Sequence, residues 1–298
     1  MTYETLLYDA EGAIATITLN RPDELNTIVP PMPDELEAAV HRAVRDPDVK
    51  VIVLRGAGRA FCAGYDFRGG FHHWDELLTT DGRWDPGKDF VGTTSHALAP
   101  TQKFMSIWRS PKPVIAQVHG WCVGGGSDYA LCADLVIASE DARIGTPYSR
   151  VWGAYLSGMW IYRLGLAKAK EHALTGRPLS GRQAADIALI NEAVPFADLE
   201  ATVRRRADEL ASLPLAQLAA MKLMVNQAYE NMGLASTQTL GSILDGIMRN
   251  IPEAHQFIER AEREGVPAAV AGRDELFADY SAAPESEKPD PRNVIDPR

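Results

Sequence analysis

Residues Lys112 to Asp128 read Lys-Pro-Val-Ile-Ala-Gln-Val-His-Gly-Trp-Cys-Val-Gly-Gly-Gly-Ser-Asp. The run 114–118 is short, apolar and rich in β-branched residues, which is typical of a strand that is covered on both faces. Residues 127–133 read as a helix, so the three glycines would lie at its N-terminus. This strand, turn and helix predict an α/β protein.

The flanking sequence repeats this alternation of strands and helices. Residues 13–19 alternate apolar and polar side chains with period two, and a helical pattern follows at 33–44. Further apolar strands are predicted at 49–54 and 135–138, and strands separated by helices favour parallel crossover connections. Beyond residue 165 the pattern is helical, with helices predicted at 168–175, 181–187, 198–213, 215–231 and 250–265.

Composition excludes several classes of protein. Hydrophobic residues make up 46% of the 298 and charged residues 23%, which is typical of a globular chain and not of a disordered one. The net charge of −10 argues against general binding of nucleic acid or of an anionic membrane. No apolar run approaches the ~20 residues of a membrane span, and no signal peptide is visible.

The three cysteines, Cys62, Cys122 and Cys132, are too few and too scattered for a disulfide framework, and none belongs to a CxxC pair. We therefore expect a cytoplasmic protein with buried, reduced cysteines and no metal site. One long interval, residues 66–103, lacks periodicity, contains Gly, Pro and aromatic residues, and is predicted to be a functional loop.

Glycine-rich segments at 55–66, 112–128 and 141–148 are the strongest candidates for chemistry. Neither of the first two matches GxGxxG, and the chain has no GxxxxGK[ST] and no GxSxG, so nucleotide-binding loops and a nucleophile elbow are not indicated. The glycines could serve only close packing of a helix on a strand. Alternatively, their backbone amides could stabilise a developing oxyanion, aided by the positive end of the following helix.

Five segments together, in order and spacing, resemble the crotonase superfamily of enoyl-CoA hydratases and isomerases: 18–22, 60–66, 124–126, 140–147 and 174–180. The resemblance covers roughly residues 4–230. It implies a spiral of ββα units at 1–205 and a helical C-terminal region at 206–270 that forms trimers or pairs of trimers. Residues 271–298, rich in proline and charge, are expected to form an extended tail.

The resemblance also implies an acyl-CoA thioester as substrate, with coenzyme A as part of that substrate and no separate cofactor. Its oxyanion hole corresponds to the backbone amides of Tyr65 and Gly125. The residues that it places against coenzyme A are Glu24, Leu25, Ala63, Asp66, Phe67 and Arg68.

The sequence departs from the family's hydratases at their two glutamates. Those positions hold Asp128, which keeps a carboxylate, and Tyr148, whose phenol has a pKa of about 10 in water and is a hydrogen-bond donor at neutral pH. One interpretation is a hydratase or isomerase in which Asp128 moves the proton. A decarboxylase or C–C hydrolase, which needs no second carboxylate, is an alternative, and a non-catalytic acyl-CoA binder is another. His72 and His73, in the 66–103 interval, are weaker candidates, and His119 is expected to be a packed core residue.

Overall fold

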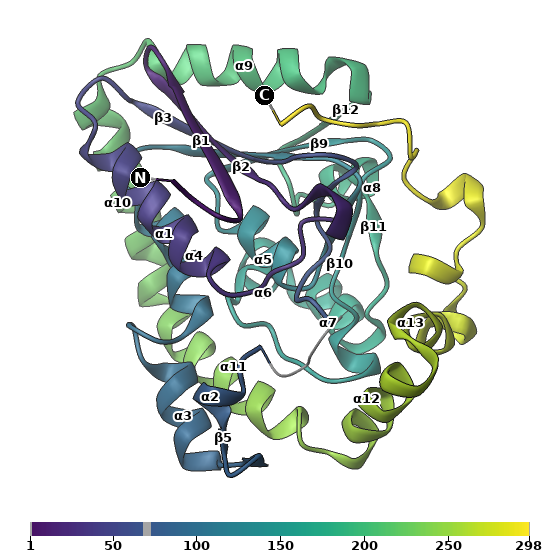
Figure 1. Cartoon of the computed structure of the whole chain (residues 1–298). Helices are drawn as coiled ribbons and strands as arrows, with labels where there is room; N and C mark the ends of the chain where they lie inside the picture. The colour runs from purple at the N-terminus through teal and green to yellow at the C-terminus, as the bar shows by residue number, and fades with distance from the viewer. Residues whose placement is uncertain (1, 68–72, 298) are drawn as a thin grey trace.

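The computed structural model describes residues 2–67 and 73–297 and shows an α/β fold built on two main sheets (Figure 1). Only β1 and β2 are antiparallel in the larger sheet, and the remaining pairs are parallel. This confirms the predicted fold class. In spatial order, the six strands are β1 (Leu6–Glu11), β2 (Ile14–Leu19), β3 (Val51–Gly56), β7 (Val114–Val118), β9 (Leu135–Ser139) and β12 (Glu192–Val194).

The chain repeatedly crosses from the larger sheet to a smaller one. Each of β3, β7 and β9 is followed directly by a strand of the smaller sheet, and helices connect the successive pairs. This is the ββα repeat that the sequence predicts. The smaller sheet contains, in spatial order, β11 (Leu179–Ser180), β10 (Arg143–Gly145), β8 (Trp121–Val123) and β4 (Ala60–Cys62).

Alternating side chains of the larger sheet pack into two different cores, which explains the nearly continuous apolar runs. In β3, Ile52 and Leu54 join the main core beneath α1 (Met32–Arg45). Val51 and Val53 instead join a second cluster with α9 (Phe196–Ala211), which covers the opposite face (Figure 1). Each fully buried side chain of this size stabilises the fold by ~1.5–3 kcal/mol.

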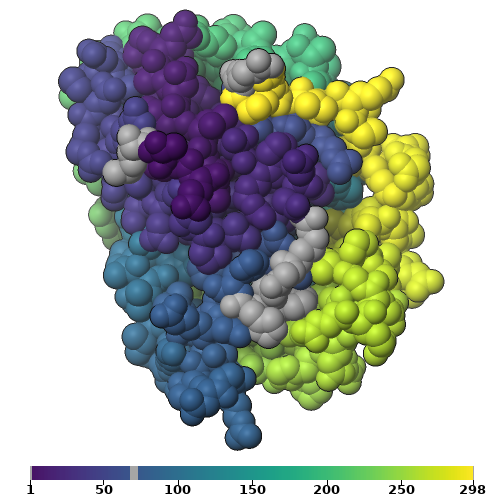
Figure 2. All heavy atoms as spheres, in the orientation of Figure 1, coloured from purple at the N-terminus to yellow at the C-terminus, as the bar shows by residue number. Residues whose placement is uncertain are grey.

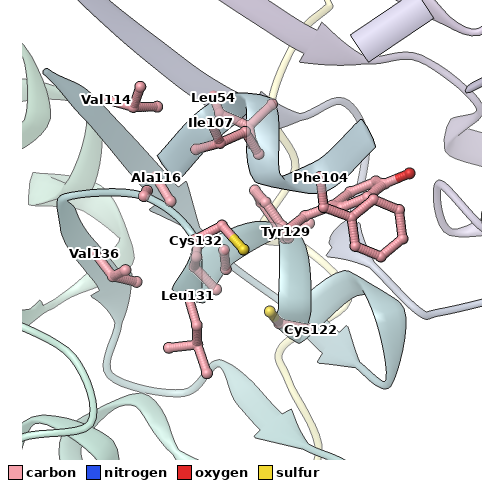
Figure 3. Close-up of a cluster of buried hydrophobic side chains, with 14 of the residues drawn as sticks. Leu54, Phe104, Ile107, Val114, Ala116, Cys122, Tyr129, Leu131, Cys132 and Val136 are labelled. Atoms are coloured by element: carbon pink, nitrogen blue, oxygen red, sulfur yellow. The ribbon is translucent and has the colours of Figure 1, made fainter. Parts of the chain in front are cut away.

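The helix that follows the glycine triplet lies inside the main core. All residues of α5 (Gly125–Leu131) are buried, and Tyr129 meets Phe104 edge to face with 4.3 Å between ring centroids (Figure 3). A methyl group at Gly126 would overlap the carbonyl oxygen of Cys62. Glycine at this position therefore lets the helix approach β4 closely.

Residues 66–103 differ from the predicted loop. Their described part contains α2 (Asp75–Leu78), a hairpin of β5 (Thr79–Thr80) and β6 (Arg83–Trp84), and α3 (Pro86–Thr94). Asp85 caps α3 by accepting hydrogen bonds from the amides of Gly87 and Lys88, both at 3.0 Å. The following helix, α4 (Pro100–Arg109), was not predicted either.

Helices dominate the second half of the chain. Two of them are notable: α10 has no buried residue along its whole length, and α11 was not predicted. No helix in the described part of the chain is both long and apolar enough to cross a membrane. The helices are α6 (Met159–Arg163), α7 (Leu166–Thr175), α8 (Gly181–Asp186), α10 (Leu215–Asn231), α11 (Leu234–Met248), α12 (Pro252–Glu264) and α13 (Val266–Asp274).

The C-terminal residues differ from the expected extended tail. They begin within α13, continue through three short 3₁₀ turns, and run along the flank of the molecule (yellow in Figures 1 and 2). Arg150, 3% exposed, pairs with Asp274 at 3.0 Å and Asp279 at 2.6 Å. The buried Tyr280 donates to the carbonyl of Gly176 at 2.8 Å. These tertiary contacts hold a segment whose composition alone indicates an extended chain.

Candidate active site

A cavity of about 620 Å³ lies between the two glycine loops, the α2–α4 segment, α11 and the C-terminal residues. Its wall includes Gly64, Tyr65, Gly125 and Tyr148. The cavity therefore contains the positions that the sequence assigned to the oxyanion hole.

The two glycine loops are in direct contact. Gly64 has a φ of +96°, and a methyl group there would lie 2.8 Å from the carbonyl oxygen of Val123 in the second loop. A methyl group on Gly125 would lie 2.8 Å from Ile28 Cδ1 and 2.9 Å from the ring of Tyr65. Side chains at these positions would separate the loops, so glycine brings the two backbones together.

The backbone around Tyr65 leaves its amide available. Ile28 donates to the carbonyl of Gly64 at 2.8 Å and accepts from the amide of Asp66 at 3.1 Å, which fixes the loop on both sides of Tyr65. Gly125 is the first residue of α5, where amides have no acceptor within the helix. Within residues 2–67 and 73–297, neither the Tyr65 nor the Gly125 amide donates a hydrogen bond. The site thus offers two backbone donors.

Asp128 lies behind Tyr148. It is 1% exposed, it accepts hydrogen bonds from the amide (3.2 Å) and hydroxyl of Ser157, and it is absent from the cavity wall. Its second oxygen accepts from the Tyr148 hydroxyl at 3.3 Å, and Tyr148 does line the cavity. Burial raises the pKa of Asp128 to about 6, although the hydrogen bonds from Ser157 and Tyr148 oppose this rise.

Tyr148 is held in place by its backbone and its neighbours. It belongs to the 3₁₀ turn Pro147–Arg150, in which proline occupies the first position. Its ring meets that of Tyr155 edge to face at 6.1 Å, and a methyl group at Gly153 would lie 2.5 Å from its ring. Burial raises the pKa of the Tyr148 phenol well above 10, so the hydroxyl stays neutral at physiological pH.

Five of the six residues assigned to coenzyme A line the same cavity: Glu24, Leu25, Ala63, Asp66 and Phe67. Arg68, the sixth, and His72 lie outside the described residues.

Three of these five have further contacts that define the cavity rim. The carboxylate of Asp66 pairs with Arg21 at 3.1 Å and accepts from the Thr27 hydroxyl at 3.0 Å. The amide of Ala63 donates to the carbonyl of Leu25 at 3.0 Å. Asp66 therefore braces the loop that carries Tyr65.

The two other histidine candidates lie away from the cavity. His73 is exposed and is not part of the cavity wall. His119 is fully buried, its Nε2 lies 2.8 Å from the carbonyl oxygen of Gly58, and burial lowers its pKa to about 4. Among the residues that the structure describes, no group of three His, Cys, Asp or Glu side chains could hold a metal ion.

The sequence analysis missed polar residues that α11 contributes to the cavity wall. Ser242 and Asp245 of α11 line the cavity, as does Arg249, the residue that directly follows the helix. Arg249 bonds Asp245 at 2.9 Å and Asp89 of α3 at 2.9 Å. Burial raises the pKa of Asp245, and Arg249 opposes that rise. The sequence signal that could have identified these residues is their spacing, since they are separated by three and four positions within an apolar stretch.

Comparison with known proteins places this geometry in a family. The family model for enoyl-CoA hydratase/isomerase matches residues 9–245. A probable enoyl-CoA hydratase from Rhodobacter capsulatus is 34% identical over 281 residues, covering 93% of this chain and 99% of that protein. The 1,2-epoxyphenylacetyl-CoA isomerase of Escherichia coli is 31% identical, with 92% and 98% covered.

The crystal structure of an enoyl-CoA hydratase from Mycobacterium smegmatis is similar to this chain with a TM-score of 0.86. The two are 40% identical, and the match covers 94% of this chain and 97% of that one. The likeness confirms the crotonase fold that the sequence motifs predict. The chain belongs to the enoyl-CoA hydratase/isomerase family of acyl-CoA enzymes.

Proposed function

We propose that this protein binds an acyl-CoA thioester and stabilises its enolate with the backbone amides of Tyr65 and Gly125. The observation that carries this proposal is the direct contact of the two glycine loops at the wall of one cavity, with neither amide bonded within the described chain. Coenzyme A lies against Glu24, Leu25 and the 63–67 loop, and the acyl group extends toward Tyr148 and α11.

The physical reason is charge development on the thioester oxygen. Removal of an α-proton leaves a negative charge on the carbonyl oxygen, and two fixed amides stabilise it without reorganising. The loss of one such donor typically costs about 2.7–4 kcal/mol of barrier. Gly125 also begins α5, whose N-terminal end is positive.

Proton transfer passes through Tyr148, because Asp128 does not line the cavity. The Tyr148 hydroxyl donates to ionised Asp128, so its oxygen can accept the α-proton while its own proton moves to the carboxylate. The C–H bond breaks, its electron pair enters the enolate, and the pair of residues gains one proton. Returning that proton at another carbon gives an isomerase reaction, and addition of water to an enoyl thioester gives a hydratase reaction.

Tyr148 also supports a second candidate. A tyrosine stands on the cavity wall where the family's hydratases place a glutamate, and a phenol suits protonation of an enolate formed by loss of carbon dioxide or by C–C cleavage. These reactions need the same oxyanion hole but no second carboxylate.

Two measurements on the purified chain test the proposal. Exchange of α-protons of butyryl-CoA in deuterium oxide, followed by mass spectrometry, reports enolate formation whatever reaction follows. Hydration of crotonyl-CoA supports the hydratase, and release of carbon dioxide or a cleaved free acid from a wider acyl-CoA panel supports the second candidate. Tight binding with neither exchange nor turnover of any thioester would contradict catalysis and leave an acyl-CoA binder.

The chain also has a surface that favours self-association, and we propose a homotrimer or a dimer of trimers. The support is α10, on which Met221, Leu223, Met224 and Val225 are 53%, 66%, 68% and 56% exposed. Residues 206–270 are then the helical region through which the copies meet.

A further inference from the structure

We propose that the substrate's acyl group carries a second, uncharged oxygen, such as a ketone, that accepts a hydrogen bond from Arg249. This inference rests on the proposed function, because it takes the acyl group to lie at the α11 end of the cavity. It adds a substrate class, an acyl-CoA with an oxo group remote from the thioester, to a site that otherwise specifies only the thioester.

Arg249 lines the cavity and has unused hydrogen-bonding capacity. Its Nε donates to Asp245 at 2.9 Å, and its Nη2 donates to the two oxygens of Asp89 at 2.9 and 3.1 Å. Within the part of the chain that the structure describes, Nη1 has no acceptor. The side chain is 20% exposed and lines the cavity. A guanidinium carries five N–H donors, so Nη1 is free to donate to a ligand in the cavity.

The guanidinium is fixed before a ligand arrives. Asp245 precedes it by one turn of α11, while Asp89 comes from α3 on the facing segment. Asp89 is 3% exposed and also accepts from the indole of Trp84 at 2.8 Å. A methyl group at Gly246 would lie 2.7 Å from Asp89, so glycine permits this approach. A donor held by two elements loses little entropy on binding.

The residues that line the cavity favour some acyl groups over others. On the α2 side it is apolar, with Trp74, Leu77 and Leu78, and a simple alkyl chain would suit that surface. The same alkyl chain would displace water from Nη1 and offer no acceptor in return. Two carboxylates surround a single guanidinium, so the cluster's net charge is negative and disfavours a terminal carboxylate. An uncharged oxygen satisfies the donor without this repulsion.

Calorimetry with a matched set of six-carbon thioesters tests the inference. The probes are hexanoyl-CoA, 4-oxohexanoyl-CoA, 5-oxohexanoyl-CoA and adipoyl-CoA, each titrated into the full chain. We expect at least one oxo derivative to bind about tenfold or more tightly than hexanoyl-CoA, which is the range of a hydrogen bond to a charged group. Adipoyl-CoA should bind no more tightly than hexanoyl-CoA.

Two variants assign the preference to Arg249. Arg249→Gln should reduce the ratio of hexanoyl to oxohexanoyl dissociation constants to about one. Because this change leaves two acids without their cation, Asp89→Asn/Arg249→Gln, which keeps the cluster's net charge, provides a second measurement. Arg263→Gln, an exposed arginine on α12 that is 68% exposed, should keep the preference.

The outcomes separate the two proposals. Equal affinities for hexanoyl and oxohexanoyl thioesters in the unmodified chain would overturn this inference alone, as would tightest binding of adipoyl-CoA. Retention of the oxo preference in both Arg249 variants would overturn it too. If none of the four thioesters binds, the proposed function fails and the inference falls with it.

Discussion

We propose that Asp128 and Tyr148 act as one proton-transfer unit, and the burial of the Asp128 carboxyl then determines how its activity depends on pH. The proposed base is the ionised carboxylate, whose pKa is raised to about 6. We therefore expect kcat/KM to fall tenfold per pH unit below about 6 and to level off above it. Asp128→Asn should lower kcat by about 10²–10⁴-fold and remove this acidic limb. A pH–rate profile in the range 4.5–9 measures both effects.

Tyr148→Phe distinguishes a relay from direct transfer by Asp128. Because the hydroxyl lies between the carboxylate and the cavity, its removal should lower kcat by an amount similar to that of Asp128→Asn. Tyr155→Phe is the matched control, since this neighbouring tyrosine packs on Tyr148 and is not part of the cavity wall. Near-full turnover in Tyr148→Phe would mean that Asp128 reaches the substrate by another route.

The sequence could predict the parts of the site that belong to glycine motifs. The family resemblance assigned Tyr65 and Gly125 from two segments far apart in the chain. The structure brings these segments into contact, and the role of the two amides stays a prediction. Asp245 and Arg249 could not be assigned in this way, because they lie on, and directly after, a helix that the sequence did not indicate, and Arg249 meets Asp89 only in the folded chain. Local pattern reveals a backbone motif, whereas a charge cluster built from two segments depends on tertiary structure.

Helices and strands were predictable where one periodicity dominates. The boundaries of β7 and α10 match the predictions residue for residue. β7 is covered on both faces, and α10 begins after Pro214 and ends just before Gly233, which has a φ of +94°. The failures include α3, which begins with the Asp85 cap, and residues 271–298. In both, polar residues that read as loop sequence bind particular partners.

The C-terminal segment depends on Arg150, and its removal should loosen that segment. Arg150→Met leaves Asp279, whose side chain is 12% exposed, without its cation, whereas Asp274 keeps Arg273 at 2.6 Å. Breaking a buried pair from one side costs about 3–5 kcal/mol. We expect a corresponding loss in the free energy of urea unfolding and faster proteolysis after residue 274. Arg182→Met is the control: its pair with Glu140 has a guanidinium that is 64% exposed, and such pairs contribute only ~0–1 kcal/mol.

Partial recovery should follow when the uncompensated charge is also removed. Asp279→Asn in the Arg150→Met background eliminates the carboxylate that has lost its cation and should regain part of the lost stability. Equal stability of Arg150→Met and the unmodified chain would show that the 3₁₀ turns, with Tyr280 bonded to Gly176, hold the segment without the ion pairs.

One side of the molecule presents apolar side chains to solvent, because α10 packs on the rest of the chain without burying any residue fully. Exposed apolar side chains occur singly on many proteins, but Met221, Leu223, Met224 and Val225 are nearly consecutive and all more than half exposed. Each such side chain, if covered by another copy, would contribute ~1.5–3 kcal/mol. A closed ring of copies would cover this surface in every protomer.

Leu223→Glu/Met224→Glu should therefore dissociate the assembly. In sedimentation velocity at micromolar concentration, we expect the unmodified chain to migrate as three or six copies and the double variant as one, because two glutamates would have to be buried at the contact. Leu276→Glu, at a leucine that is 90% exposed outside α10, should leave the assembly intact. An unmodified chain that sediments as a single copy would contradict the trimer, and α10 would then be a solvent-facing helix despite its methionines and leucines.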